Sequence, residues 1–222
     1  MQIETGINTK PIPQQSPVPI DTQTSPKQGL LFVLSAPSGA GKDTVIGKLR
    51  ERGVDFHVVS SVTTRAPRKG ESDGNPYHFI SREAFQRMVD QNELLEYAEV
   101  YGNWYGQPLQ QVTENLRIGR DVLLKIDVQG AATVRSKVSE AIFIFLMPAS
   151  IQEQIERLTN RQTETEEEQA RRLAEAKKEL AQREQFEYVI VNRQGRIEEA
   201  VTHLHAIMQA EHCRTHPRYM KI

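Results

Sequence analysis

The chain has 222 residues and carries 28 Lys and Arg against 29 Asp and Glu, so its formal net charge is −1. This length suits one domain with small inserts, and a composition of 38% hydrophobic and 26% charged residues excludes a chain that is disordered throughout or a fibrous repeat. The balanced charge argues against a partner that is nucleic acid or a membrane surface, and no apolar run approaches the roughly 18–20 residues of a spanning helix. The single cysteine, Cys213, cannot form an internal disulfide, so we expect a reducing, cytoplasmic compartment.

Residues 1–27 differ in composition from the rest of the chain. They hold five of the eleven prolines, with Gln, Thr and Ser between them. Proline fixes φ and removes a backbone donor, and this segment offers little apolar surface to offset the entropy of ordering. We therefore expect a disordered tail, with a proline-rich ligand motif at Pro17-Val18-Pro19 as the alternative. The segment lacks the apolar stretch of a secretory signal and the arginines of a transit peptide.

From Gly29 onwards the pattern is that of a globular α/β domain. The first apolar run has no polar interruption, as expected of a strand buried on both faces of a sheet. Short runs rich in Val, Ile and Leu predict strands at 30–34, 57–62, 122–126, 142–147 and 188–191. Amphipathic segments predict helices at 42–50, 81–90, 130–137, 150–161, 166–183 and 195–211. Strands that alternate with helices predict a parallel sheet covered by helices on both faces.

A glycine-rich segment follows the first predicted strand and precedes a helix. It reads Ala36-Pro37-Ser38-Gly39-Ala40-Gly41-Lys42-Asp43-Thr44. Glycines let backbone N–H groups approach an anion, the start of a helix adds positive potential, and Lys42 can reach the β- and γ-phosphates of a nucleotide. We interpret the segment as a phosphate-binding loop rather than a simple glycine-rich turn. Two positions depart from the usual motif, because Ala36 replaces its first glycine and Asp43 replaces the Ser or Thr that contacts Mg²⁺.

The segment 60–77 suggests a second phosphate site. Arg65 and Arg68 stand three residues apart with a proline between them. A stiff pair of guanidinium groups suits the three oxygens of a phosphate monoester. The hydroxyls of Tyr77 and Tyr105 can add donors. Either arginine alone would be better explained as a surface charge, but their joint spacing favours a phosphate.

Glu96 is a candidate for reading a base. A carboxylate can accept two hydrogen bonds from the N1–H and N2–H₂ edge of guanine, and adenine offers no such pair of donors. A solvated charge at the end of a helix is the simpler interpretation of Glu96 taken alone. Together with two phosphate sites, it favours a guanine nucleotide.

In their order along the chain, these motifs resemble those of the guanylate kinases, P-loop enzymes that transfer a phosphoryl group from ATP to GMP. The similarity runs from about Gly29 to Cys213. Besides the phosphate-binding loop, the motifs that carry it are Thr63-Thr64-Arg65-Ala66-Pro67-Arg68, Tyr77-His78-Phe79, Leu95-Glu96-Tyr97-Ala98, Gly102-Asn103-Trp104-Tyr105-Gly106, Ile126-Asp127-Val128-Gln129-Gly130-Ala131, Arg157-Leu158, Arg161, Thr163-Glu164-Thr165-Glu166-Glu167, Arg172-Leu173 and Val189-Ile190-Val191-Asn192.

The resemblance implies a P-loop fold with a five-stranded parallel core sheet and two inserts. A GMP-binding insert would span about 61–107 and a lid about 157–172. The domain would occupy 28–213, between the tail at 1–27 and a C-terminal tail at 214–222. ATP and GMP, with dGMP beside it, would be the substrates, Mg²⁺ the cofactor and purine nucleotide metabolism the setting.

The resemblance also implies roles for individual residues. Those that would contact guanine are Ser61, Glu96 and Gln107. Those that would hold the GMP phosphate are Arg65, Arg68, Tyr77 and Tyr105. ATP would be bound by the loop from Ala36 to Thr44 and by Asn192. The groups around the transferring phosphoryl would be Lys42, Arg157, Arg161 and Arg172. Asp127, which follows a predicted strand, would hold Mg²⁺ through water or else cap a helix, and Asp43 is a second candidate for the metal.

Four further positions depart from the family pattern. Gln107 stands where the family usually has Ser or Thr beside the guanine. Lys125 occupies a position that often holds an acid; a cation there can pair with Asp127, contact a phosphate or weaken base recognition. Gln162 replaces a lid glycine, and Arg193 replaces an Asp. None of these changes removes a charge that phosphoryl transfer requires.

Two other functions remain open on the sequence alone. One is a ribose 1,5-bisphosphate phosphokinase, whose loop also reads Gly-Lys-Asp but which lacks the full Arg-x-Pro-Arg…Tyr set. The other is a non-catalytic guanylate-kinase-like module that binds phosphorylated peptides. Such modules have degraded phosphate loops, and Lys42 with the lid arginines argues against one here.

Overall fold

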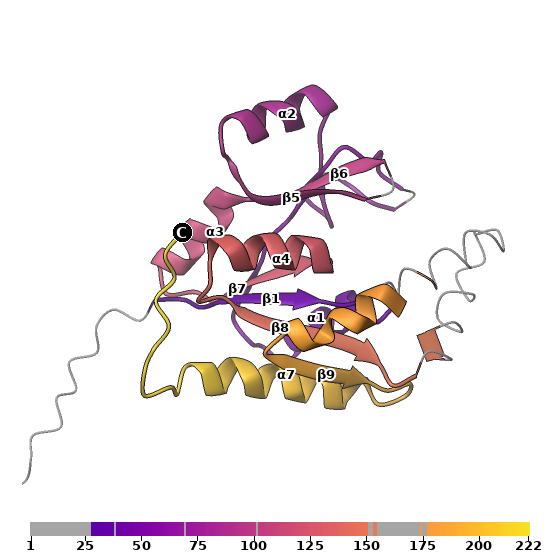
Figure 1. The fold of residues 1–222 in the computed structure, drawn as a ribbon, viewed down its shortest axis with the longest axis vertical. Coiled ribbons are helices and arrows are strands. Elements are labelled where there is room, and N and C mark those ends of the chain that lie inside the picture. Colours follow the sequence, from indigo (N-terminus) through magenta and orange to yellow (C-terminus); the bar gives the residue numbers. More distant parts are fainter. Residues whose placement is uncertain are drawn as a thin grey trace, which may run out of the picture.

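Each of the five predicted strand regions contributes a strand to one central sheet. The computed structural model describes residues 28–37, 39–68, 70–100, 102–150, 153–154, 174 and 177–222. In these residues the sheet has the order β2-β7-β1-β8-β9, with every neighbouring pair parallel (Figure 1). Its strands are β1 (Leu31–Ser35), β2 (His57–Val58), β7 (Val122–Ile126), β8 (Ile142–Pro148) and β9 (Tyr188–Asn192). All residues of β1 are buried, as expected of a central strand in a parallel sheet that helices cover on both faces. The predicted fold class is confirmed.

Helices connect these strands. They are α1 (Lys42–Glu51), α2 (Arg82–Asp90), α3 (Leu109–Arg117), α4 (Val128–Lys137) and α7 (Ile197–Glu211), with a short 3₁₀ helix, η1 (Gln182–Gln185), before β9. Four of the predicted helices coincide with α1, α2, α4 and α7 to within two residues at each end. The helix α3 was not predicted, because it begins directly after the last residue of a strand. The predicted helix at 150–161 lies almost wholly outside the described residues, and of the one at 166–183 residues 177–181 are helical.

A second, smaller sheet projects from the first on the side where α3 and α4 lie (Figure 1). Its strands, in the order β4-β3-β6-β5, are β3 (Val62–Thr63), β4 (His78–Phe79), β5 (Leu94–Val100) and β6 (Asn103–Pro108). Val62, Phe85 of α2 and Leu94 form a small apolar core of their own between this sheet and α2. This sheet lies within the segment that the sequence analysis assigns to an insert.

The prediction of a single strand at 57–62 was wrong. His57 and Val58 pair with β7 in the central sheet, whereas Val62 and Thr63 pair with β4 and β6 in the second sheet. Between them, the backbone of Ser60 is bonded by one side chain: its N–H donates to Gln111 Oε1 at 3.1 Å, and Gln111 Nε2 donates to its carbonyl at 3.2 Å. A side-chain amide thus satisfies the backbone where the chain passes from one sheet to the other.

The C-terminal segment 214–222, expected as a tail, packs on the domain. Met220 belongs to the main core, and its backbone N–H and carbonyl both bond to the side-chain amide of Gln28. The Arg218 guanidinium donates to Glu211 at 2.8 Å and to Glu187 at 2.9 Å. The Glu211 side chain is only 1% exposed, and Arg218 is the nearest of the positive charges that neutralise it.

Candidate active site

The phosphate-binding loop lies between β1 and α1, as its sequence context predicts. Gly41 precedes α1 with φ +94°, and a Cβ at this position would come within 2.7 Å of Asn192 Nδ2, so glycine is required there for both reasons. Lys42 is the first residue of α1, and its Nζ donates to the carbonyl of Ala36 at 2.9 Å. Burial lowers the pKa of Lys42. Ser38 lies outside the described residues.

Asn192 supports this loop from the end of β9. Its side chain is 4% exposed, and its Nδ2 donates to the carbonyl of Ala40 at 2.8 Å. The family resemblance implies a contact with the adenine of ATP. The structure places the Asn192 amide against the loop backbone, so its first effect is to hold the loop in shape; an adenine contact stays a prediction.

Three buried polar residues meet at the base of the second sheet. Ser61 is 5% exposed, Glu96 3% and Gln107 2%. Glu96 and Gln107 face each other across the β5–β6 ladder, and Gln107 Nε2 donates to Ser61 Oγ at 2.7 Å. Glu96 Oε2 and Gln107 Oε1 have no hydrogen-bond partner among the described residues. Two buried acceptors without donors are costly, which indicates a site built for a ligand that brings N–H groups.

The environment of Glu96 favours its neutral form. Burial, reinforced by the negative charge of Asp127, raises the pKa of Glu96 to about 8, while Gln107 and Lys137 act in the opposite direction. Asp127 caps α4, because its Oδ1 accepts from the N–H of Gly130 at 2.8 Å. The helix-cap alternative for Asp127 is therefore realised in the structure, and a second role toward Mg²⁺ stays a prediction.

The acceptor-phosphate patch predicted at Arg65, Arg68, Tyr77 and Tyr105 has an organiser that the sequence analysis did not assign. Glu71 accepts two bonds of 3.0 Å from the Arg65 guanidinium and one of 2.7 Å from the Arg68 backbone N–H. The Arg65 guanidinium also stacks 5.6 Å from the centre of the Tyr77 ring, and the rings of Tyr77 and Tyr105 meet edge to face at 5.7 Å. These contacts bring three of the four predicted residues together; the Arg68 side chain is exposed.

Two departures from the family pattern contact each other. Lys125 Nζ lies 2.5 Å from Asp43 Oδ1, although the two residues are 82 positions apart in the sequence. Lys125 was predicted to pair with Asp127, contact a phosphate or weaken base recognition, and its contact with Asp43 was not predicted. Only the fold, which pairs Leu34 of β1 with Lys125 of β7, brings the end of β7 beside the start of α1.

The lid arginines Arg157, Arg161 and Arg172 lie outside the described residues, as does Gln162. Of the two candidate metal ligands, Asp43 is engaged by Lys125 and Asp127 by the start of α4. Within the part of the chain that the structure describes, no group of three or more His, Cys, Asp or Glu side chains could hold a metal ion. Mg²⁺ that arrives on a nucleotide needs only one or two carboxylates, so these residues still fit it.

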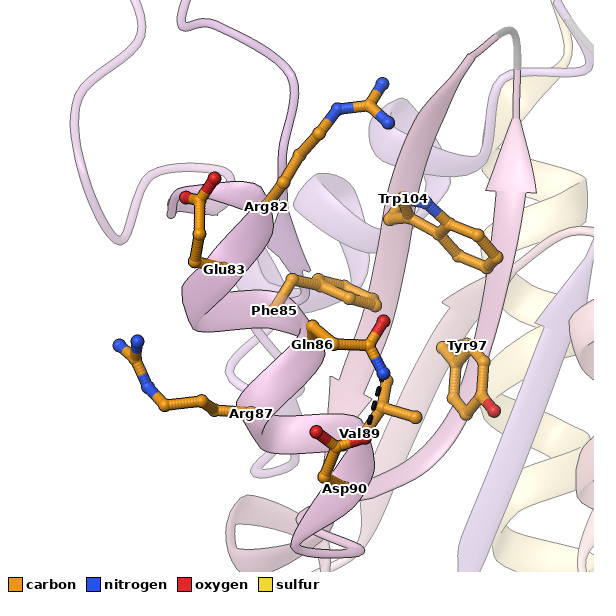
Figure 2. Close-up of a pocket in the computed structure, with 9 residues that line it drawn as sticks. All are labelled: Arg82, Glu83, Phe85, Gln86, Arg87, Val89, Asp90, Tyr97 and Trp104. Atoms are coloured by element: carbon orange, nitrogen blue, oxygen red, sulfur yellow. Dashed lines mark hydrogen bonds between the residues drawn. The ribbon is translucent and has the colours of Figure 1, made fainter.

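A cavity of about 660 Å³ lies elsewhere, between α2 and the outer face of the second sheet. Figure 2 shows Phe85, Tyr97 and Trp104 gathered between the helix and the strands, with a 2.8 Å hydrogen bond from Gln86 to Asp90 on the helix. None of the residues predicted to bind substrate lines this cavity. The candidate site built from Lys42, Glu96 and their neighbours is therefore separate from this cavity.

A parallel sheet whose first strand leads into a phosphate-binding loop and a helix defines the P-loop NTPase fold. The chain belongs to the guanylate kinase family, whose sequence model, described as "Guanylate kinase", matches residues 28–211.

Individual relatives agree with this assignment. The chain is 47% identical over 188 residues to the guanylate kinase of Halalkalibacterium halodurans, which covers 85% of this chain and 91% of that one. It is 43% identical over 198 residues to guanylate kinase 2, chloroplastic/mitochondrial, of Oryza sativa subsp. japonica, with 89% and 70% covered. The crystal structure of guanylate kinase from Anaplasma phagocytophilum aligns with a TM-score of 0.70 at 37% identity over 85% of this chain and 89% of that one. None of the helices among the described residues has both the length and the apolar character needed to span a membrane.

Proposed function

We propose that this chain transfers the γ-phosphoryl group of ATP to GMP, with dGMP as a second acceptor. The observation that carries the proposal is the buried carboxylate of Glu96, which keeps one oxygen without a partner beside Ser61 and Gln107. Asp127 acts electrostatically on both Glu96 and Lys42, which supports placing the base-reading carboxylate and the phosphate-binding lysine in one site.

Guanine suits the Glu96 pocket chemically. Its N1–H and N2–H₂ groups can donate to the two carboxylate oxygens, and Gln107 Oε1 offers another acceptor. Adenine would instead place its N1 lone pair against the carboxylate. Because guanine bonds to the charged form of Glu96, its binding lowers the carboxyl pKa and is linked to proton release near neutral pH.

Each phosphate has its own set of donors in this proposal. The GMP phosphate is held by Arg65, Arg68, Tyr77 and Tyr105, and the ATP phosphates by the loop from Ala36 to Thr44, which Asn192 supports from behind. Phosphoryl transfer requires the two phosphates in line and their spreading negative charge neutralised, with little covalent help from the protein. Lys42 supplies a positive charge at the start of α1, and the arginines Arg157, Arg161 and Arg172, whose roles rest on the family resemblance, would add to it.

Mg²⁺ bound to ATP would neutralise part of the phosphate charge. Asp127 is the residue proposed to hold it, through water, because its carboxylate stands at the end of a central strand within electrostatic reach of Lys42. We also assign the reaction to purine nucleotide metabolism in the cytoplasm, with no nucleic-acid or membrane partner.

A coupled assay of ADP release tests the proposal. Purified protein with Mg²⁺-ATP is offered GMP, AMP, UMP, CMP and ribose 1,5-bisphosphate in separate reactions. GMP should be by far the best acceptor. Preference for ribose 1,5-bisphosphate would replace the proposal with the sugar kinase, and no transfer to any acceptor, together with binding of a phosphopeptide, would replace it with the interaction module.

A further inference from the structure

Lys125 stands where the two phosphate-binding regions meet. It lies near the end of β7, in register with Leu34 of β1, the strand that leads into the phosphate-binding loop. Its Nζ is 2.5 Å from Asp43 Oδ1 in the first turn of α1 and 5.4 Å from the centre of the Tyr77 ring in the acceptor-phosphate patch. A single ammonium group therefore contacts the ATP side and the GMP side of the site.

The exposure of the pair is asymmetric. The side chain of Lys125 is 15% exposed, whereas that of Asp43 is 82% exposed. An ion pair with a carboxylate this exposed contributes little to folding stability, because water screens it. Asp43 can therefore turn away when a stronger anion arrives, while Lys125 stays in place on its strand.

Lys125 also adds to the positive charge around Lys42. Burial lowers the pKa of Lys42, Glu179 and Asp43 act in the opposite direction, and the Lys125 ammonium adds a smaller lowering effect, so Lys125 acts electrostatically on Lys42. The Asp43 carboxylate offsets the repulsion between these two cations, and a bound phosphate would offset it more strongly because it carries more charge. The arrangement is that of a site for a multiply charged phosphate group.

The ion pair between Lys125 and Asp43 also explains why both residues depart from the family pattern in the same chain. A carboxylate directly after Lys42 would repel the phosphates of ATP if its charge were not compensated. Lys125 compensates it at 2.5 Å. Asp43 and Lys125 therefore act as one unit, in which the lysine brings a positive charge to the reaction centre and the aspartate keeps that charge oriented when no phosphate is bound.

We propose that Lys125 is a second phosphate-binding lysine of the reaction, whose ammonium contacts the phosphoryl group as it passes from ATP to GMP, and that Asp43 is its positioning residue. This inference rests on the proposed function. The bond from the γ-phosphorus to the β–γ bridging oxygen breaks, a bond to an oxygen of the GMP phosphate forms, and Lys125 stays protonated throughout.

Steady-state kinetics of Lys125→Met, Lys125→Arg, Asp43→Asn and the double variant Asp43→Asn/Lys125→Met test this assignment. Lys125→Met should lower kcat about 10²-fold, the usual loss for one preorganised charge donor, with the KM for GMP changed only a few-fold. Lys125→Arg should recover most of that loss. Asp43→Asn should lower kcat by less, and adding it to Lys125→Met should cause no further loss, because a positioning residue has nothing left to position. Lys48→Met is the matched control: Lys48 is on α1, pairs with Glu198 at 2.7 Å and should keep wild-type kcat.

A binding measurement separates phosphate contact from a structural role. Adenosine and guanosine joined through five phosphates occupy both sites at once, and calorimetry should show about tenfold weaker binding of this analogue to Lys125→Met, with GMP alone bound as in wild type. Unchanged kcat and analogue affinity in Lys125→Met would overturn the proposal. So would a raised Mg²⁺ requirement in Asp43→Asn with no effect of Lys125→Met, since Asp43 would then be a metal ligand. If the proposed function itself were wrong, wild-type protein would not phosphorylate GMP, and this result differs from the two that would overturn the role of Lys125.

Discussion

Replacing Glu96 by Gln should remove a pH-dependent loss of stability. Glu96 is 97% shielded from solvent, and its pKa is raised from the ordinary 4.5 to about 8 by burial and by Asp127. The folded protein therefore binds a proton at Glu96 more tightly than the unfolded chain does. The stabilisation from this proton is fully present below about pH 4.5 and is lost as the pH rises toward about 8.

The size of the effect follows from the two pKa values. The difference between the folded and unfolded pKa values corresponds to a stabilisation of about 4–5 kcal/mol, as an upper limit. About 3 kcal/mol of this stabilisation is lost between about pH 5.5 and 8.5. Glutamine keeps the shape of the side chain and does not titrate. The free energy of unfolding of Glu96→Gln minus that of wild type should therefore increase by about 3 kcal/mol across this range.

Urea titrations of both proteins at several pH values measure this difference. Lys137 and Asp127 face the same carboxyl and are present in both proteins, so their own contributions largely cancel in the comparison. A difference that stays constant within about 0.5 kcal/mol would refute the buried, neutral carboxyl. Calorimetry of GMP binding near pH 7 in two buffers adds a second check, because wild type should release more protons than Glu96→Gln does.

Three other substitutions distinguish residues that bind the phosphates from a residue that stabilises the fold. Lys42→Met should lower kcat by about 10³-fold or more while the protein stays folded, and steady-state rates together with a melting curve check it; near-wild-type kcat would mean that the loop does not bind the transferring phosphate. Arg68→Ala should raise the KM for GMP strongly with a smaller effect on kcat, because it removes a contact present in both ground and transition states; a pure loss of kcat would contradict this. Arg218→Ala should lower the free energy of unfolding by about 2–3 kcal/mol, because the buried Glu211 carboxylate loses its nearest arginine. Arg214→Ala is the control, because Arg214 is exposed and lies 3.6 Å from the same carboxylate. In urea titrations of both variants, Arg214→Ala should cost about 0.5 kcal/mol or less.

The sequence predicts those parts of the fold that are specified by residues close together in the chain. The uninterrupted apolar run of β1 and the glycines before Lys42 specify a buried strand, a turn and a helix start within one short stretch. The segment 57–62 is rich in valine but also contains Ser60 and Ser61, and it divides between two sheets where Gln111, distant in sequence, satisfies the backbone of Ser60. Strands of two residues such as β3 and β4 are too short to show a period.

In the candidate site too, the chemistry of single side chains could be predicted, whereas contacts between distant residues could not. Glu96 and Gln107 were predicted from the chemistry of their side chains and the family resemblance, and the structure brings them together with Ser61. Glu71 and the contact between Asp43 and Lys125 depend on which strands are neighbours, and a linear pattern does not contain that information. The lid arginines lie outside the described residues, so their positions stay predictions.

The claim that the Glu96 pocket reads guanine can be tested most directly with IMP, which keeps the N1–H of GMP but lacks its 2-amino group. The measurement is the ratio of kcat/KM for GMP to that for IMP in wild-type protein. Loss of one donor leaves a buried acceptor unsatisfied, so the ratio should be about 10–100, the equivalent of roughly 1–3 kcal/mol. Equal kcat/KM values for GMP and IMP would contradict recognition of the 2-amino group by the buried carboxylate.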